Sequence, residues 1–152
     1  MDISIELVKQ LRDETGVSIA KCKEALEQAE GDIEKARAVL VEFSAGQMAK
    51  KADRELGAGA ISTYVHSNKT VGTLIELLCE TDFVAKNEAF VDLGKNLAMH
   101  ITAMGSTPET IMEESYIMDP EMTIHTLIES TMQKLGERIE IGRMHRIQVL
   151  AE

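Results

Sequence analysis

The stretch that most restricts the fold of this chain lies at residues 74–87, where an apolar run stops abruptly at polar residues. Residues 74–78 are nearly all apolar, which predicts a buried strand. The polar residues 80–82 then favour a turn, and a helix is expected to begin only after Phe83. Phe83 follows at once, in a chain with only 3% aromatic residues, so its position at this junction needs an explanation. Because phenylalanine is usually buried, we expect it to pack in the core; the alternative is that it projects, with Asp82, toward a partner.

Helical spacing of apolar residues organises the first third of the chain. The pattern predicts helices over 3–14 and 18–29 and a third that begins after Asp32, with left-handed helix ends at Gly16 and Gly31. The third pattern continues well beyond the length of the first two, although a glycine inside it weakens the helix by roughly 1 kcal/mol relative to alanine. We therefore predict a three-helix bundle that is followed by a connecting helix.

Strand spacing begins after the glycine-rich residues 56–59. The alternating residues 61–65 and the apolar run 71–79 flank a polar turn, which predicts a β-hairpin whose second strand is central and covered on both faces. A third strand over 139–150 is expected to return to this hairpin. Between the strands, the sequence predicts helices over 88–104, 109–114 and 123–136, with an irregular segment at 116–121 that contains Pro120.

The fold class that these patterns predict is α+β: an N-terminal three-helix bundle, a connecting helix, and a small antiparallel three-stranded sheet packed with helices. The predicted domain limits are 1–45 for the bundle, 46–57 for the connecting helix and 58–152 for the α+β core. A chain of 152 residues is long enough to bury a sizeable core.

The charge of the chain limits the kinds of partner that it can bind. Its net charge is −10, which disfavours nucleic acid and acidic membrane surfaces. Through Arg54, nine lysines and arginines stand against eleven aspartates and glutamates, whereas the rest of the chain has seven against fifteen. The nearly neutral N-terminal part is able to meet an acidic surface, and ordinary surface variation explains the asymmetry equally well.

The sequence contains cysteine and histidine residues, which can catalyse reactions or bind metals, but their spacing is not that of a catalytic or metal site. Cys79 ends a predicted buried strand, where cysteine usually behaves as a small hydrophobe, so a thiol nucleophile is not expected. The histidines lack metal-ligand spacing: His66, His100, His125 and His145. No glycine-rich phosphate loop follows a strand, and the aromatic residues are too few to stack bases. We expect no enzyme activity, no metal, no cofactor and no bound nucleic acid, which leaves a partner-binding protein.

The cysteine content and the N-terminal residues favour a cytoplasmic location. Only Cys22 and Cys79 are present, so no disulfide framework is implied and a reducing compartment is expected. The N-terminal residues lack the basic start and apolar block of a signal peptide. No apolar run approaches the roughly 20 residues that span a bilayer, so no membrane partner is expected.

Five segments of the sequence resemble translation elongation factor Ts, in the order in which that family carries them. They lie at residues 8–16, 22–26 followed by 30–36, 50–54, 79–87 and 136–141. The most diagnostic is Cys-Glu-Thr-Asp-Phe-Val-Ala-Lys-Asn at 79–87, which contains the Thr-Asp-Phe-Val motif of the family at 81–84. One such segment would be a weak sign, whereas five in the same order are specific.

The resemblance implies a guanine-nucleotide exchange factor for elongation factor Tu. In that family the three-helix module is ubiquitin-associated-like and docks on the GTPase domain of the partner. The motif residues Thr81, Asp82, Phe83 and Val84 would enter between partner helices near the nucleotide, displace Mg²⁺ and disturb the phosphate loop, so that GDP leaves and GTP can bind. The secondary partner contacts that the resemblance implies are Lys9, Arg12, Thr15, Gly16, Ile19 and Lys23.

The chain departs from the family pattern in two places. Residues 18–20 read Ser-Ile-Ala where many members have Gly-Met-Met; Ile19 keeps an apolar contact, but Ala20 removes a large one. Longer members carry two similar core halves, and many have a helical hairpin where this chain has only residues 105–121. Resemblance to short members therefore implies a homodimer through the sheet and a two-to-two complex with elongation factor Tu.

Two alternative functions stay open beside nucleotide exchange. One is a cysteine enzyme, which would need Cys79 to be exposed to solvent; the other is a ubiquitin-associated-like adaptor without exchange activity. In the case of the adaptor, residues 1–54 would carry all the binding, and Phe83 would have no role in it.

Overall fold

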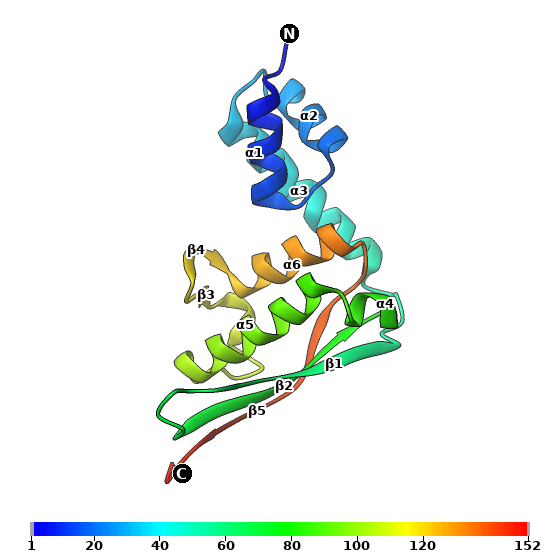
Figure 1. Cartoon of the computed structure of the whole chain (residues 1–152). Coiled ribbons are helices and arrows are strands. Elements are labelled where there is room, and N and C mark those ends of the chain that lie inside the picture. Colours follow the sequence, from blue (N-terminus) through cyan, green and yellow to red (C-terminus); the bar gives the residue numbers. More distant parts are fainter. Residues whose placement is uncertain (1, 152) are drawn as a thin grey trace. The chain divides into compact units, whose positions relative to one another are not determined.

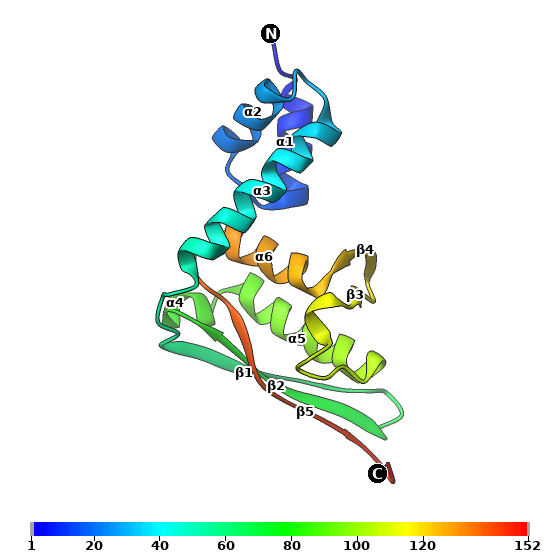
Figure 2. The same cartoon turned by 180° about the vertical axis from the view of Figure 1, so that it is seen from behind.

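The computed structural model describes residues 2–151, and only the backbone of Met48. The elements in chain order are α1 (Ile5–Thr15), α2 (Ile19–Gln28), α3 (Ile33–Lys51), β1 (Ala58–Val65), β2 (Val71–Cys79), α4 (Asp82–Ala85), α5 (Glu88–Met104), the 3₁₀ turn η1 (Ile111–Glu113), β3 (Ser115–Tyr116), β4 (Asp119–Thr123), α6 (Ile124–Leu135) and β5 (Glu140–Gln148). The mixture of helices with a small antiparallel sheet confirms the predicted α+β class (Figures 1 and 2).

The contacts of the chain separate it into two compact units. The first contains the residues up to Asp53 together with Glu129–Gly136, and the second contains Arg54–Ile128 together with the residues from Glu137 onward. Helix α6 is therefore divided between the two units. The predicted domain limits, at 1–45, 46–57 and 58–152, stay a prediction.

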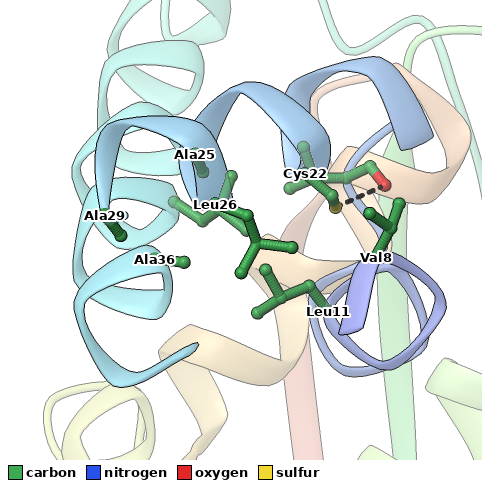
Figure 3. Close-up of a cluster of buried hydrophobic side chains, with 9 residues drawn as sticks. Val8, Leu11, Cys22, Ala25, Leu26, Ala29 and Ala36 are labelled. Atoms are coloured by element: carbon green, nitrogen blue, oxygen red, sulfur yellow. Dashed lines mark hydrogen bonds between the residues drawn. The ribbon is translucent and has the colours of Figure 1, made fainter. Parts of the chain in front are cut away.

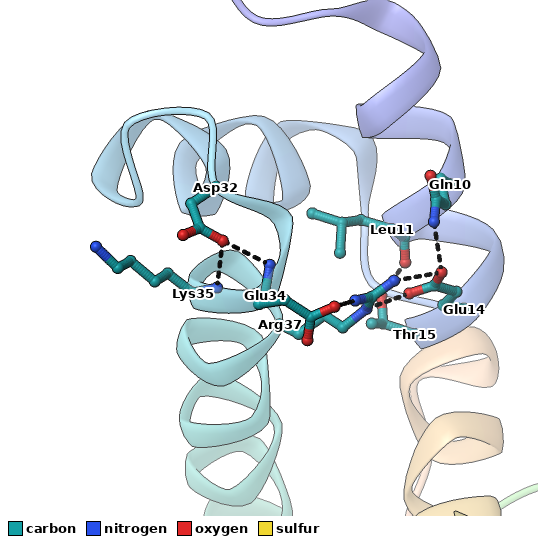
Figure 4. A network of polar contacts seen from close by, with 8 residues as sticks. All are labelled: Gln10, Leu11, Glu14, Thr15, Asp32, Glu34, Lys35 and Arg37. Carbon is teal, nitrogen blue, oxygen red and sulfur yellow. Dashed lines mark hydrogen bonds and ion pairs between the residues drawn. The ribbon is translucent and has the colours of Figure 1, made fainter. Parts of the chain in front are cut away.

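The first unit is built on a small apolar core that α1, α2 and α3 share (Figure 3). Leu11, Cys22, Leu26 and Leu40 are almost completely inaccessible to solvent in this core. The helix ends support it: the Asp32 carboxylate accepts hydrogen bonds from the first backbone N–H groups of α3 (Figure 4). As predicted, α3 then continues without a break well past the bundle core.

An ion pair joins α1 to α3 across the surface of this bundle (Figure 4). The Arg37 guanidinium donates from Nε and from its second terminal nitrogen to the two carboxylate oxygens of Glu14, at 2.8 and 2.9 Å. Arg37 also contacts Glu34 one turn earlier on α3. Bidentate arginine–carboxylate geometry fixes orientation as well as distance, so the pair supports the packing of the two helices around their shared core.

The second unit is built around β2, which lies between β1 and β5 and is antiparallel to both. The predicted central position of this strand is therefore confirmed, but the prediction that both its faces are covered is wrong, because Leu74 is 45% exposed. Helix α5 packs on one face of the sheet, where Ile75 and Leu77 are fully buried (Figure 1). Gly94 permits the close approach of α5 to β1, because a Cβ atom there would lie 2.1 Å from the Ser62 hydroxyl oxygen.

The region between α5 and α6 differs from the prediction. Residues 116–121, which were expected to be irregular, contain part of the β3–β4 hairpin, in which Tyr116 pairs with Asp119. Pro120 is compatible with this two-stranded ribbon because an edge strand tolerates a residue without an N–H group. The helix expected over 109–114 is only the short η1 turn.

A partly buried hydrogen-bond cluster joins the segment around η1 and β3 to α5. His100 is fully buried; its Nε2 lies 2.8 Å from Glu114 Oε1, and its Nδ1 accepts the backbone N–H of Ile117 at 3.3 Å. The hydroxyl groups of Ser106 and Thr110 donate to the same carboxylate at 2.5 and 2.9 Å. Burial acts to raise the pKa of Glu114, but the hydrogen bonds from Ser106, His100 and Thr110 together outweigh it and lower the pKa.

The lowered pKa of Glu114 predicts a specific loss of stability in acid. A carboxyl group whose pKa is lower when folded stabilises the fold above its unfolded value, near 4.5, and this contribution disappears as the pH falls through the folded value. We expect Glu114→Gln to lower the free energy of unfolding by about 1 kcal/mol at pH 7 and to leave it less dependent on pH below about 4.5. Urea unfolding between pH 3 and 7 measures both effects.

The matched control for this prediction is Glu113→Gln, which changes an exposed neighbouring carboxylate. It should keep the stability and the acid dependence of the wild type. Equal pH profiles for Glu114→Gln and the wild type would contradict the assignment of this carboxylate.

Candidate functional site

The candidate functional site is the corner between β2 and α4, which we define as residues 79–85. Strand β2 ends at the buried Cys79, whose thiol donates to the Thr81 carbonyl oxygen at 3.2 Å. Thr81 occupies the N-cap position of α4, where its hydroxyl oxygen accepts the Val84 N–H at 3.4 Å. Helix α4 was not predicted, since its four residues are too few to show helical spacing.

Phe83 projects from this corner into solvent. Its side chain is 91% exposed, whereas Val84 and Ala85 immediately after it are buried. Successive side chains of a helix point about 100° apart around its axis. Because Val84 and Ala85 point into the core, the Phe83 side chain points outward. The expectation that Phe83 packs in the core is wrong; the core beneath α5 is filled instead by Phe90, which is 1% exposed.

The segment that precedes β5 holds the corner in a way that the sequence did not reveal. Glu137 Oε1 accepts the backbone N–H groups of Glu80 and Thr81 at 3.1 and 2.9 Å, and its Oε2 accepts the Thr81 hydroxyl at 2.6 Å. In return, the Glu80 carboxylate accepts the backbone N–H of Arg138 at 2.6 Å. The sequence linked these two segments only in that residues 136–141 and 79–87 resemble the same family. The spacing of apolar and polar residues gave no sign that the two segments are in contact.

The thiol of Cys79 is placed for packing rather than for chemistry. Burial raises its pKa, and the neighbouring charges of Glu137, Asp82 and Glu80 act in the same direction. The thiol is therefore protonated near neutral pH, whereas a nucleophilic cysteine needs a lowered pKa. Cys22 in the first unit is equally buried.

The residues expected to make secondary partner contacts all lie in the first unit, whereas the motif at 81–84 lies in the second. Four have exposed side chains: Lys9, Arg12, Ile19 and Lys23. Thr15 is half-buried and its hydroxyl group is used internally, donating to Leu11 O at 2.6 Å and accepting the Val17 N–H at 3.2 Å. Gly16 has a φ of 72° in the left-handed turn after α1, so it shapes the turn that presents its neighbours.

Two further properties bear on the kind of site. Within residues 2–151, no three or more His, Cys, Asp and Glu side chains lie close enough together to hold a metal ion. Among the same residues, no helix has the length and apolar character to cross a membrane.

Comparison with known proteins assigns the chain to a family. The family model for elongation factor Ts matches residues 80–152, which begins inside the corner. Elongation factor Ts of Thermosipho melanesiensis is 45% identical over 151 aligned residues, which cover 89% of this chain and 77% of that protein. This chain belongs to the elongation factor Ts family. It is therefore related to the translation elongation factors, which act in protein biosynthesis.

Members of the elongation factor Ts family differ in length around this common part. The protein of Fervidobacterium nodosum is 34% identical over 195 aligned positions, covering 98% of this chain and 99% of that protein. That alignment is longer than the 152 residues of this chain, so this relative carries additional residues inside the aligned region. The protein of Clostridium botulinum is 40% identical, and the matched part is 97% of this chain but 48% of that relative.

Proposed function

We propose that this protein is a guanine-nucleotide exchange factor that binds elongation factor Tu in its GDP form, displaces Mg²⁺ and promotes GDP release. The observation that carries this proposal is the exposure of Phe83, 91%, at the tip of a hydrogen-bonded corner. Membership of the elongation factor Ts family supplies the partner and the step of translation elongation.

The physical basis of exchange is a difference in affinity between two states of the partner. A factor releases GDP only if it binds the nucleotide-free form more tightly than the GDP-bound form. Burying a fully exposed phenylalanine contributes roughly 1.5–3 kcal/mol, so a cleft that opens only when GDP leaves would provide this difference. Mg²⁺ bridges the protein and the phosphates and is the largest local charge there, so its displacement weakens the hold on GDP.

The four motif residues would have different roles in this step. Asp82 is exposed beside Phe83 and would make polar contacts in the opened cleft. Thr81 caps α4, and Val84 is buried, so these two would support the projecting pair from within the corner. Docking would use the exposed secondary contacts, Lys9, Arg12, Ile19 and Lys23, around the turn shaped by Thr15 and Gly16. We propose no covalent step, cofactor or nucleic acid.

The proposal predicts that Phe83→Ala removes most of the exchange activity. We expect at least a tenfold lower rate of GDP release from elongation factor Tu, because the lost apolar contact is worth roughly 1.4 kcal/mol or more. Release of fluorescent GDP in stopped flow, with catalytic amounts of the factor, measures this rate. Phe83 has no core contacts to lose, so the circular dichroism and the unfolding midpoint should stay unchanged.

Met104→Ala is the matched control, since it removes an apolar side chain that is 53% exposed elsewhere in the second unit. It should exchange at the wild-type rate. If wild-type protein binds elongation factor Tu without accelerating GDP release, and residues 1–54 account for the binding, the adaptor alternative is favoured instead.

We also propose that two copies of the chain associate through the sheet face opposite α5, forming a two-to-two complex with elongation factor Tu. The apolar side chains on that face are exposed: Ile61 by 60%, Val65 by 65%, Leu74 by 45% and Ile147 by 72%. They come from all three strands of one sheet. A contiguous apolar patch of this kind commonly marks a protein interface, and short members of the family imply the second copy.

The dimer proposal predicts that Ile147→Lys yields a monomer. A lysine within an apolar interface would be buried without a partner charge, which is strongly unfavourable. Light scattering at micromolar concentration should give twice the 16.8 kDa chain mass for the wild type and a single chain mass for the variant. Met104→Lys, outside the sheet, should stay dimeric. A monomeric wild type would contradict the proposal.

A further inference from the structure

We infer that Glu137 is a positioning residue for nucleotide exchange, which fixes the β2–α4 corner so that Phe83 projects before any partner is bound. The inference rests on the proposed exchange function and adds to it a residue outside the Thr-Asp-Phe-Val motif. Glu137 lies 56 residues from Thr81 along the chain, in the segment that leads into β5.

The hydrogen-bond ladder of β2 ends at the start of the corner. Cys79 is the last residue of β2 that pairs with β1, so the N–H groups of Glu80 and Thr81 have no strand partner. Glu80 is half-buried and Thr81 is exposed, so without a protein acceptor these groups would bond to water and leave the corner free to turn. Glu137 Oε1 accepts both of them, at 3.1 and 2.9 Å, which fixes the direction in which the chain leaves the sheet.

The second carboxylate oxygen of Glu137 acts on the cap of α4. It accepts the Thr81 hydroxyl hydrogen at 2.6 Å, so the hydroxyl lone pairs are left to accept the Val84 N–H. A threonine hydroxyl can rotate, and an acceptor on one side selects the rotation that supports the helix start. Both oxygens of one side chain therefore constrain the residue that lies two positions before Phe83.

The same two segments are joined by a second, reciprocal contact. The Glu80 carboxylate accepts the Arg138 N–H at 2.6 Å and lies 3.4 Å from the Arg54 guanidinium. Arg138 in turn donates from its guanidinium to the Arg54 carbonyl oxygen at 2.6 Å. Glu137 is half-buried, and hydrogen bonds to an ionised acceptor are about twice as strong as neutral ones. The backbone on the N-terminal side of Phe83 is thus fixed by the contacts with Glu137 and Arg138, and on the C-terminal side Val84 is buried.

The test compares three variants of the full-length chain in GDP release from elongation factor Tu. Glu137→Ala removes all three hydrogen bonds at the corner. Glu137→Gln keeps a carbonyl oxygen for the two backbone N–H groups and is the conservative variant. Glu109→Ala removes an exposed glutamate of the same unit and is the matched control. For each variant the rate is measured over a range of factor concentrations, which separates the maximal rate from the half-saturating concentration.

We expect Glu137→Ala to lower the maximal rate about tenfold. This corresponds to a loss of roughly 1.4 kcal/mol in the free energy that holds Phe83 in its projecting position. The half-saturating concentration should change less than threefold, because the docking residues of the first unit are untouched. Glu137→Gln should retain at least about half of the maximal rate, since it keeps the backbone acceptor. Glu109→Ala should equal the wild type. A general loss of folded protein would not give this separation or the rescue by glutamine.

Hydrogen exchange of the Thr81 amide provides a readout that does not depend on the partner. It should be slowed in the wild type and in Glu137→Gln and should be about tenfold faster in Glu137→Ala. If Glu137→Ala does not fold, Glu137→Asp replaces it: the charge is kept, but the carboxylate is drawn back by one methylene from the corner. The maximal rate of this variant should also fall.

The outcomes separate the two proposals. A wild type that does not accelerate GDP release overturns the exchange function, and the role of Glu137 with it. An active wild type whose Glu137→Ala and Glu137→Asp variants keep the full maximal rate overturns the role of Glu137 alone. An unchanged Thr81 amide in Glu137→Ala also overturns it.

Discussion

The candidate site depends on how a buried central strand ends. Strand β2 is hydrogen-bonded on both sides and covered by α5 on one face, so its position is fixed by the sheet. At Cys79 this support stops, and the N–H groups of the next two residues have no partner in the sheet. The Glu137 carboxylate accepts both N–H groups. This contact orients the backbone that leads from Thr81 through α4 to α5.

An exposed phenylalanine at this point is difficult to explain by folding alone. Leaving Phe83 in water forgoes roughly 1.5–3 kcal/mol that burial would contribute, while Val84 and Ala85 beside it are buried. The corner therefore directs small residues inward and the large aromatic residue outward. The hydrogen bonds from the corner to Glu137 and the burial of Val84 and Ala85 stabilise this arrangement in the free protein. The apolar side chain of Phe83 is therefore available to a partner.

The parts of the fold with strong local patterns could be predicted from the sequence. The central position of β2 followed from its continuous apolar run, and α5 followed from the apolar spacing over 88–104. In the structure the Asn87 side chain caps this helix by accepting the Ala89 N–H. Helix α4 was missed because four residues are too few to show the helical spacing of apolar residues. The general tendency of phenylalanine to be buried gave the wrong prediction for Phe83, which is exposed. The Glu137 contacts could not be predicted, because they join backbone groups to a side chain 56 and 57 residues away.

The exposure of residue 83 before and after binding tests the central claim most directly. The chain contains no tryptophan, so Phe83→Trp introduces a single indole at the tip of the corner. Its emission should be that of a water-exposed indole in the free protein and should shift to shorter wavelength when nucleotide-free elongation factor Tu is added, after subtraction of the wild-type mixture. An indole that is already shielded in the free protein, or one whose emission does not change in the complex, would contradict a projecting side chain that enters the partner.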